Sequence, residues 1–153
     1  MMAERSASVH ASCVLVGARA VLIRGPSASG KSQLALELIQ AAASGSLRFA
    51  RLVADDRVHL APAGGRLLAR PAEALAGLIE VRGVGLLRLP YEPCAVVGLV
   101  VDLAATDGSR LPGSEQREAA IDGIVLPRLP VASGTDALPA VLTLLNSPAE
   151  CWV

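Results

Sequence analysis

The sequence predicts an α/β domain built on a mixed β-sheet that is flanked by helices. Its 153 residues suit one domain with a sizeable core. Hydrophobic residues make up 52% of the chain, yet Phe, Tyr and Trp occur once each. The core must therefore be built from Val, Leu, Ile and Ala, which pack well in parallel or mixed sheets covered by helices. The third observation is the order strand, glycine-rich loop, helix near the N-terminus.

The N-terminal third is predicted to form two strands and a helix. Apolar runs over Ser12–Val16 and Arg19–Ile23 are typical of a β-hairpin. The glycine-rich segment Gly25–Ser32 follows directly. Apolar residues then recur at helical spacing over Gln33–Ala43, and Gly45 is a suitable stop.

The remainder predicts further strands and a closing helix. We expect a strand over Arg51–Ala54, a hairpin of Val58–Ala61 and Arg66–Ala69, a helical turn over Pro71–Ala76, a loop-like patch at Glu80–Gly85 inside the apolar segment Leu78–Leu89, a buried strand over Ala95–Leu103, a surface loop over Ala104–Arg117, extended segments over Ile121–Leu126 and Pro127–Val131, and a helix over Leu138–Leu145. No repeat or linker divides the chain, so residues 1–153 are expected to form a single domain.

The charge balance and the cysteines exclude several classes of partner. The 14 basic and 14 acidic residues cancel, which argues against nucleic acid or an anionic membrane as partner. The three cysteines Cys13, Cys94 and Cys151 are far apart, so we expect buried thiols rather than disulfides or a metal site. The apolar runs near the N-terminus are too short for a membrane helix, and the flanks do not indicate a signal peptide. These features predict a cytoplasmic location.

The glycine-rich segment matches the pattern G-x-x-x-x-G-K-[ST] and predicts a phosphate-binding loop, or P-loop. Glycines let the backbone approach a ligand, successive N–H groups form an anion nest, and the helix that follows adds its positive dipole end. The lysine can reach the β and γ phosphates of ATP, and the final serine can bind Mg²⁺. The residues concerned are Gly25, Pro26, Ser27, Ala28, Ser29, Gly30, Lys31 and Ser32.

Two adjacent carboxylates, Asp55 and Asp56, follow a strand that could lie beside the strand preceding the loop. In an extended backbone they point in different directions. One could face Mg²⁺ or a nucleophile while the other pairs with a neighbour such as Arg57. Alone, the pair is also compatible with a solvated turn, but its distance from the loop fits one strand–helix–strand unit.

Other polar residues are weaker candidates. Glu80 and Arg82 lie beside two glycines and suit a metal and phosphate site, although, taken alone, an exposed salt-bridged loop explains them better. His10 precedes the first strand and by itself resembles a surface residue. We interpret His59 as structural.

Taken together, these segments resemble the C-terminal catalytic domain of the HPr kinase/phosphorylase family. The resemblance runs from Val9 to about Leu145. It is carried, in order, by the His10 segment, the loop Gly25–Ser32, Leu52–Val58 with its Asp-Asp-Arg, Leu78–Gly85 with Glu-x-Arg-Gly-x-Gly, and the strand pair Ile124–Val131. It implies a P-loop-containing mixed sheet of the HPr kinase C-terminal type.

The resemblance implies an ATP- and Mg²⁺-dependent kinase acting on a serine of HPr, the phosphocarrier of the sugar phosphotransferase system, in the regulation of carbohydrate metabolism. The family also reverses this step by phosphorolysis, and its members form oligomers. Seven residues would have roles: Lys31 binds phosphate, Ser32 and Glu80 bind the metal, Asp55 is the catalytic carboxylate, His10 sits near Asp55 and tunes it, Asp56 supports the site, and Arg82 contacts phosphate or substrate.

The resemblance also leaves alternatives open. The chain reads Val131–Asp136 where the family carries an arginine-containing segment. Compared with long members, the chain is expected to have no N-terminal domain and a shortened C-terminal helix. It resembles the truncated forms of the family found in some proteobacteria. A nucleotide-binding regulatory module without protein-kinase activity is therefore the second hypothesis. A small-molecule kinase with Ala104–Arg117 as its lid is the third.

Overall fold

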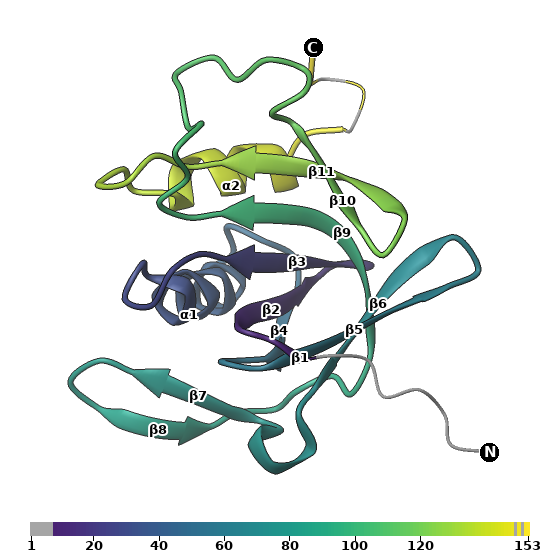
Figure 1. Ribbon diagram of the computed structural model, residues 1–153. Coiled ribbons are helices and arrows are strands. Elements are labelled where there is room, and N and C mark those ends of the chain that lie inside the picture. The colour runs from purple at the N-terminus through teal and green to yellow at the C-terminus, as the bar shows by residue number, and fades with distance from the viewer. Residues whose placement is uncertain (1–7, 149, 151) are drawn as a thin grey trace.

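The computed structural model describes residues 8–148, 150 and 152–153 (Figure 1). Its elements are β1 (Ser8–Val9), β2 (Ala11–Val16), β3 (Arg19–Arg24), α1 (Lys31–Ala43), β4 (Ala50–Ala54), β5 (Val58–Ala63), β6 (Arg66–Pro71), the 3₁₀ turn η1 (Glu73–Leu75), β7 (Leu78–Val81), β8 (Gly85–Arg88), β9 (Ala95–Asp102), β10 (Glu118–Ile121), β11 (Ile124–Pro130) and α2 (Leu138–Leu145). The architecture confirms the predicted mixed α/β class.

The centre of the sheet brings four chain segments to one edge. β3 and β11 both pair with β9 in parallel, and β2 pairs antiparallel with both β3 and β4. The strands β3, β4, β9 and β11 therefore run in the same direction and end on the same side, at the left of Figure 1. β4 does not lie beside β3, as the sequence suggested, because β2 is inserted between them.

The sheet divides at β9, the longest strand of the described residues. The start of β9 pairs with β6, where Ala95 lies opposite Ala69, and its end pairs with β11. The β5–β6 hairpin and β1 continue the first branch, and β10 continues the second. Because the two branches leave the same edge of β9, the sheet curls around its centre.

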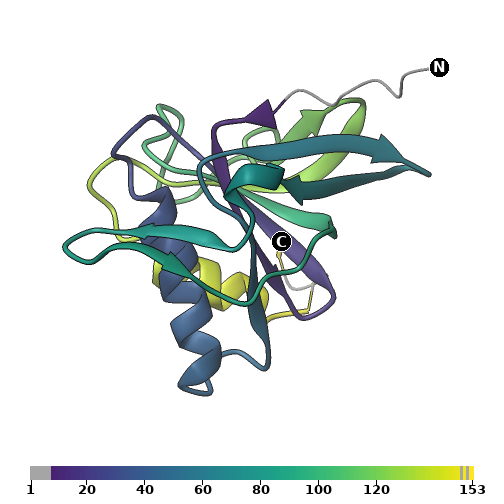
Figure 2. The same cartoon turned by 90° about the horizontal axis from the view of Figure 1, so that it is seen from below.

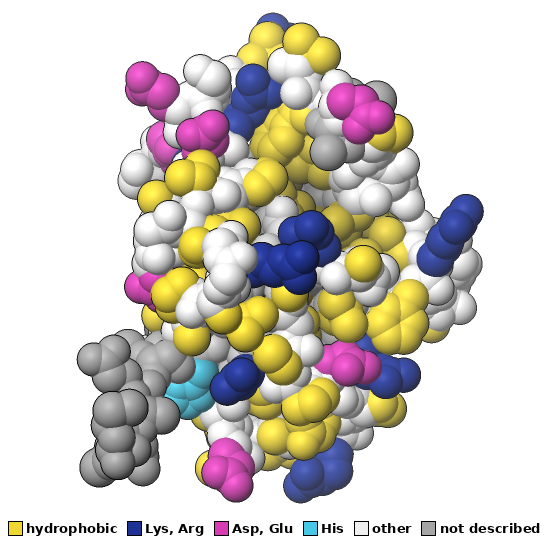
Figure 3. All heavy atoms as spheres, turned by 90° about the vertical axis from the view of Figure 1, so that its right-hand side faces the viewer, with side chains coloured by type: hydrophobic (Ala, Val, Ile, Leu, Met, Phe, Trp, Pro, Cys, Tyr) yellow, Lys and Arg dark blue, Asp and Glu magenta, His cyan; other side chains and the backbone are white. Residues whose placement is uncertain are grey.

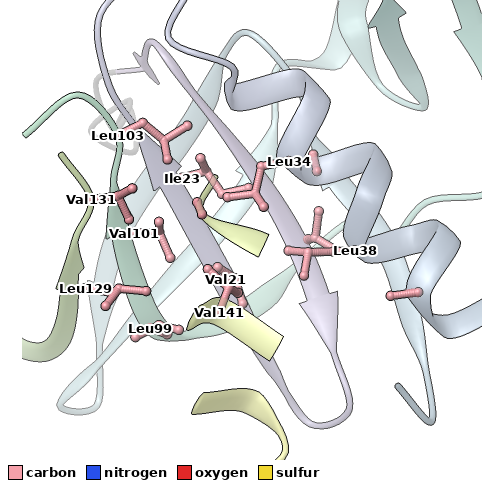
Figure 4. Close-up of a cluster of buried hydrophobic side chains, with 14 of the residues drawn as sticks. Val21, Ile23, Leu34, Leu38, Leu99, Val101, Leu103, Leu129, Val131 and Val141 are labelled. Atoms are coloured by element: carbon pink, nitrogen blue, oxygen red, sulfur yellow. The ribbon is translucent and has the colours of Figure 1, made fainter. Parts of the chain in front are cut away.

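Both helices cover one face of this sheet, and Figure 2 shows them on the same side. Leu34 and Leu38 of α1 and Val141 of α2 pack there against strand residues that include Ile23 and Val101 (Figure 4). Burying each such side chain contributes about 1.5–3 kcal/mol before entropy is counted. The opposite face buries a second cluster, which is closed by β5, β6 and the β10–β11 hairpin. The helices thus hold the core beneath the edge where the parallel strands end.

Local patterns predicted most elements correctly, with two exceptions. The segment Glu80–Gly85 is mostly part of a β-hairpin and not a loop, because β7 and β8 pair and Glu80 lies opposite Leu86. The segment Ile124–Val131, expected to form a strand pair, instead contributes the single strand β11, and the turn to its partner β10 lies at Asp122-Gly123. Both turn residues there have positive φ, of 49° and 79°, which suits an Asp-Gly hairpin turn.

The structure also tests the expectation of buried cysteine thiols and bears on the question of a membrane-spanning helix. Cys13 is buried, and burial raises the pKa of its thiol to about 12. Cys94 is exposed, so the expectation of a buried thiol was wrong at this position, while Cys151 lies outside the described residues. In the part of the chain that the structure describes, neither helix combines the length and apolar composition needed to cross a bilayer.

Candidate functional site

The Gly25–Ser32 loop joins β3 to α1 and wraps around its own lysine. Lys31 Nζ donates hydrogen bonds to the carbonyl oxygens of Gly25 and Pro26, both at 2.9 Å. The lysine is only 7% exposed although it opens the helix. Its ammonium group is therefore held near the N-terminus of α1, where the helix dipole favours negatively charged ligands.

The interior of this loop fits a phosphate group. A Cβ on Gly25 would lie 2.5 Å from Ser29 Oγ and 3.1 Å from the carbonyl oxygen of Leu103, so only glycine fits the closed turn. Gly30 caps α1 with a φ of 99°, and no side chain caps the helix. Among the described residues, Ser29 Oγ is buried without a hydrogen-bond partner. Because the first N–H groups of a helix also lack intrahelical partners, an anion here would satisfy several donors at once.

Asp55 is the most connected polar residue beside the loop. It is 4% exposed. Its Oδ1 accepts hydrogen bonds from Ser12 Oγ at 2.6 Å and Ser32 Oγ at 2.7 Å. Its Oδ2 lies 2.9 Å from the same Ser32 hydroxyl and accepts the backbone N–H of Glu80 at 3.1 Å. One carboxylate thus connects the start of β2, the end of β4, the start of α1 and the hairpin strand β7.

A bulge in β4 directs Asp55 toward α1. Leu52 lies opposite Val14 but Ala54 lies opposite Cys13, so Val53 is an extra residue in β4. Val53 and Ala54 consequently both face the core opposite the helices. Regular alternation would have placed Asp55 on that face too, whereas the extra residue turns it to the α1 face.

Ser12 is a site residue that the sequence analysis did not identify. It is 1% exposed and was predicted only as part of a strand. The signal available was a lone hydroxyl within the buried run that begins β2. That signal is weak, because a serine in a strand is common and its partner lies 43 positions away.

His10 and Asp56 form a second pair at the rim of the site. His10 Nε2 lies 2.8 Å from Asp56 Oδ1, and the two side chains are 41% and 61% exposed. The sequence placed His10 near Asp55 and offered Arg57 as the partner of Asp56, whereas the structure pairs His10 with Asp56. Asp56 has a φ of 68°, and its side chain is 61% exposed, whereas Asp55 is buried.

Glu80 and Arg82 reach the site differently from what the sequence suggested. Glu80 contributes its backbone N–H to Asp55, while its side chain is exposed on β7. Arg82 is exposed in the turn of the β7–β8 hairpin, which projects on the same side of the molecule as the Gly25–Ser32 loop (Figures 1 and 2). Within the described ranges, no three His, Cys, Asp or Glu side chains are grouped to hold a metal ion. Mg²⁺ in proteins retains several waters and often binds through only one or two protein groups together with phosphates. Ser32 and Asp55 would therefore be enough to bind Mg²⁺ without a larger set of protein ligands.

An ion-pair network supports the strand that leads into the loop. Arg24 Nε and Nη2 donate to the two Asp102 oxygens at 2.7 and 2.9 Å, linking β3 to β9. Arg128 on β11 also donates to Asp102, and it donates to both Asp107 oxygens in the loop after β9. Burial opposes ionisation of Asp102, but the hydrogen bonds and charges of the two arginines outweigh it, so the pKa of Asp102 lies below its usual value.

An apolar cavity of about 400 Å³ lies at the other end of β3, between α2 and the sheet. Figure 3 shows this face, with hydrophobic side chains around a hollow above a central group of basic residues. Among the described residues, Arg19 is the only titratable side chain that lines the cavity. Chemically capable groups therefore gather at the Gly25–Ser32 loop and not in this cavity.

Comparison with known proteins gives a consistent picture. The family model described as HPr Serine kinase C-terminal domain matches residues 1–91. HPr kinase/phosphorylases of Streptococcus thermophilus and Streptococcus pneumoniae are each 38% identical over 146 residues, covering 87% of this chain. The match covers 45% and 44% of those proteins, so the chain spans less than half their length. A solved structure, the Hpr(Ser) kinase/phosphatase from Coxiella burnetii, superimposes with a TM-score of 0.72 and 24% identity, covering 91% of this chain and 88% of that one.

Proposed function

The chain belongs to the family of the HPr serine kinase C-terminal domain, and we propose that it is an ATP- and Mg²⁺-dependent serine kinase. Its acceptor would be HPr or an HPr-like phosphocarrier of the sugar phosphotransferase system in the cytoplasm, and its role would be the regulation of carbohydrate metabolism. The observation that carries the proposal is the buried Asp55 carboxylate, 2.7 Å from the Ser32 hydroxyl at the mouth of α1.

The loop would bind the triphosphate through donors that it already presents. Lys31 would exchange its carbonyl partners for phosphate oxygens, which form stronger charge-assisted hydrogen bonds. Ser29 Oγ and the first N–H groups of α1 would gain acceptors. Bound Mg²⁺ would neutralise charge on the phosphates and fix their orientation. Ser32 would hold the ion through its oxygen while donating its proton to Asp55.

Asp55 has the geometry for a proton acceptor. Its two oxygens differ, because Oδ1 receives Ser12 and Ser32 while Oδ2 receives the Glu80 N–H and the longer contact from Ser32. When Ser32 donates to Oδ1 alone, Oδ2 retains a free lone pair. We assign Oδ2 as the atom that accepts the proton of the attacking serine hydroxyl. His10 would support the site through Asp56.

The β7–β8 hairpin would contribute to the acceptor side of the site. Arg82 at its turn is exposed on the side of the loop, where a guanidinium can bind phosphate or an acidic part of the acceptor. Glu80 would bind the metal through water, since its side chain is exposed while its backbone is tied to Asp55.

Phosphate transfer from γ-labelled ATP to purified HPr tests this function. The wild-type chain with Mg²⁺ should label a serine of HPr, and the Asp55→Asn variant should lower the rate at least ~100-fold, because the loss of a general base typically costs this much. An acceptor in which the target serine is alanine is the control. Equal transfer by wild type and variant, or none by either, would refute the assignment.

A second candidate is a nucleotide-binding regulatory module without protein-kinase activity. The segment between β11 and α2 carries no arginine, and Asp136 within it lies close enough to Glu37 of α1 to contribute to the raised pKa of Glu37, whose main cause is burial. The segment thus presents the exposed carboxylate of Asp136 where the family resemblance implies an arginine. Tight calorimetric binding of ATP combined with no transfer to HPr would favour this candidate.

A further inference from the structure

We propose that Ser12 is a positioning residue of the site, whose hydroxyl fixes Asp55 so that Ser32 is held ready for Mg²⁺. The inference deepens the proposed function and rests on its assignment of Mg²⁺ to Ser32. It concerns a residue that neither the motifs nor the family resemblance identifies. Its basis is one short, buried hydrogen bond from Ser12 Oγ to Asp55 Oδ1 at 2.6 Å.

Ser12 lies within a buried part of β2. Its strand neighbours Ala11 and Cys13 are fully buried, and Ser12 itself is 1% exposed. A buried hydroxyl without a partner is costly, and the Asp55 carboxylate supplies the partner by accepting its hydrogen bond. The bond joins β2 to the end of β4, next to the bulge that turns Asp55 to the α1 face. Strand pairing and side-chain bonding therefore converge on the same carboxylate.

The Ser12 hydroxyl makes the two oxygens of Asp55 inequivalent. The terminal torsion of an aspartate is broad, so a carboxylate without fixed donors turns easily. Ser12 holds Oδ1 from one side, and the Glu80 N–H holds Oδ2 from another. The Ser32 hydroxyl therefore donates to a carboxylate whose orientation is already fixed. This fixes the direction of the Ser32 O–H bond and so the direction of the lone pairs on Ser32 Oγ. Ser12 thus acts on the metal ligand through Asp55, without touching nucleotide or metal.

This arrangement separates two kinds of binding. The phosphate donors of the loop do not involve Ser12, so nucleotide affinity without Mg²⁺ should be insensitive to it. The gain in affinity that Mg²⁺ confers depends on the orientation of Ser32, and it should fall when Ser12 loses its hydroxyl. A role in folding alone would weaken both affinities together.

Calorimetric titration of ADP in EDTA and in Mg²⁺ provides the test. Ser12→Ala should leave the dissociation constant in EDTA within twofold of wild type and reduce the Mg²⁺-dependent gain about tenfold. The variants Ser12→Thr and Ser12→Val are isosteric and differ only in carrying a hydroxyl or a methyl group at one position. The threonine variant should retain the Mg²⁺-dependent gain in affinity that the valine variant loses. Ser44→Ala is the matched control. Ser44 follows the C-terminal end of α1, far along the helix from the site, and its hydroxyl donates to the Ala41 carbonyl oxygen at 3.2 Å.

The outcomes are distinguishable from failure of the kinase assignment. An unchanged Mg²⁺ gain in folded Ser12→Ala, or an equal loss in EDTA and Mg²⁺, would overturn the role of Ser12. If Ser12→Ala does not show a thermal unfolding transition, the threonine and valine pair decides, and equal gains in both would overturn it. The two assignments fail separately. If the wild-type chain transfers no phosphate to HPr but Ser12→Ala still loses the Mg²⁺-dependent gain in affinity, the positioning role of Ser12 stands and the kinase assignment is rejected.

Discussion

Asp55 and Ser32 are 23 positions apart, and the Ser32 hydroxyl lies 2.7 and 2.9 Å from the two oxygens of the Asp55 carboxylate. The contact exists because β3 and β4 end at the same edge of the sheet, with α1 beginning directly after the loop that follows β3. Ser32 cannot reorient toward a ligand without changing its bond to Asp55. Events at the phosphate end of the site are therefore transmitted to the carboxylate.

Lys31 is the only lysine of the chain, which gives the loop its own spectroscopic probe. Protein labelled with ¹⁵N-lysine should show a single backbone amide signal, from the first residue of α1. Adding ADP should shift this signal strongly, because that N–H faces the expected phosphate position. Adenosine, which lacks phosphates, is the control and should shift it little. Equal shifts with both ligands would contradict a phosphate site at the loop.

Replacing Lys31 by alanine should weaken ATP binding by about 3 kcal/mol, since charge-assisted contacts in a preorganised site have this magnitude. Calorimetry should therefore show a dissociation constant that rises by roughly two orders of magnitude. Unfolding by heat without nucleotide separates this effect from loss of structure, because Lys31 also bonds to Gly25 and Pro26. An unchanged dissociation constant in a folded variant would reject the assignment.

Gly25→Ala should damage the loop through steric overlap. The added methyl group would meet Ser29 Oγ at 2.5 Å and the Leu103 carbonyl at 3.1 Å, so the backbone must shift. Such overpacking costs about 1–3 kcal/mol, and nucleotide affinity should fall about tenfold or more. Gly113→Ala is the matched control, because its nearest neighbour would be Gln116 Oε1 at 3.7 Å. Equal affinity in both variants would show that the loop tolerates the shift.

The loop and the helix after it could be predicted from the sequence because their signals are local. The glycine pattern of Gly25–Ser32 and the apolar spacing of α1 depend on neighbours only a few residues away. The hairpin of β7 and β8 was missed for the opposite reason. Arg82 and Gly83 resemble a loop, and only the pairing of Glu80 with Leu86 shows that they form its turn.

Long-range pairing explains what the sequence could not provide about the site. The extra residue Val53 decides on which face Asp55 lies, and a bulge leaves no mark in the pattern of this apolar strand. The bond from Ser12 and the pairing of His10 with Asp56 each follow from that geometry. Asp55 and Asp56 were identified as candidates by residue type, but their partners required the fold.

Asp102→Asn should reduce both stability and its dependence on acid. Hydrogen bonds and charges from Arg24 and Arg128 outweigh burial and hold the pKa of Asp102 below its usual value of 3.8. A lowered pKa contributes stability above about pH 4, and the contribution disappears as the pH falls through the folded-state pKa. The variant should lose about 2 kcal/mol at pH 7, because Arg128 is only 14% exposed and keeps its charge. Denaturant unfolding of both proteins between pH 2 and 7 measures this difference. The gap should narrow at acidic pH, and a gap of constant size would show that the Asp102 charge is not what stabilises the strand before the loop.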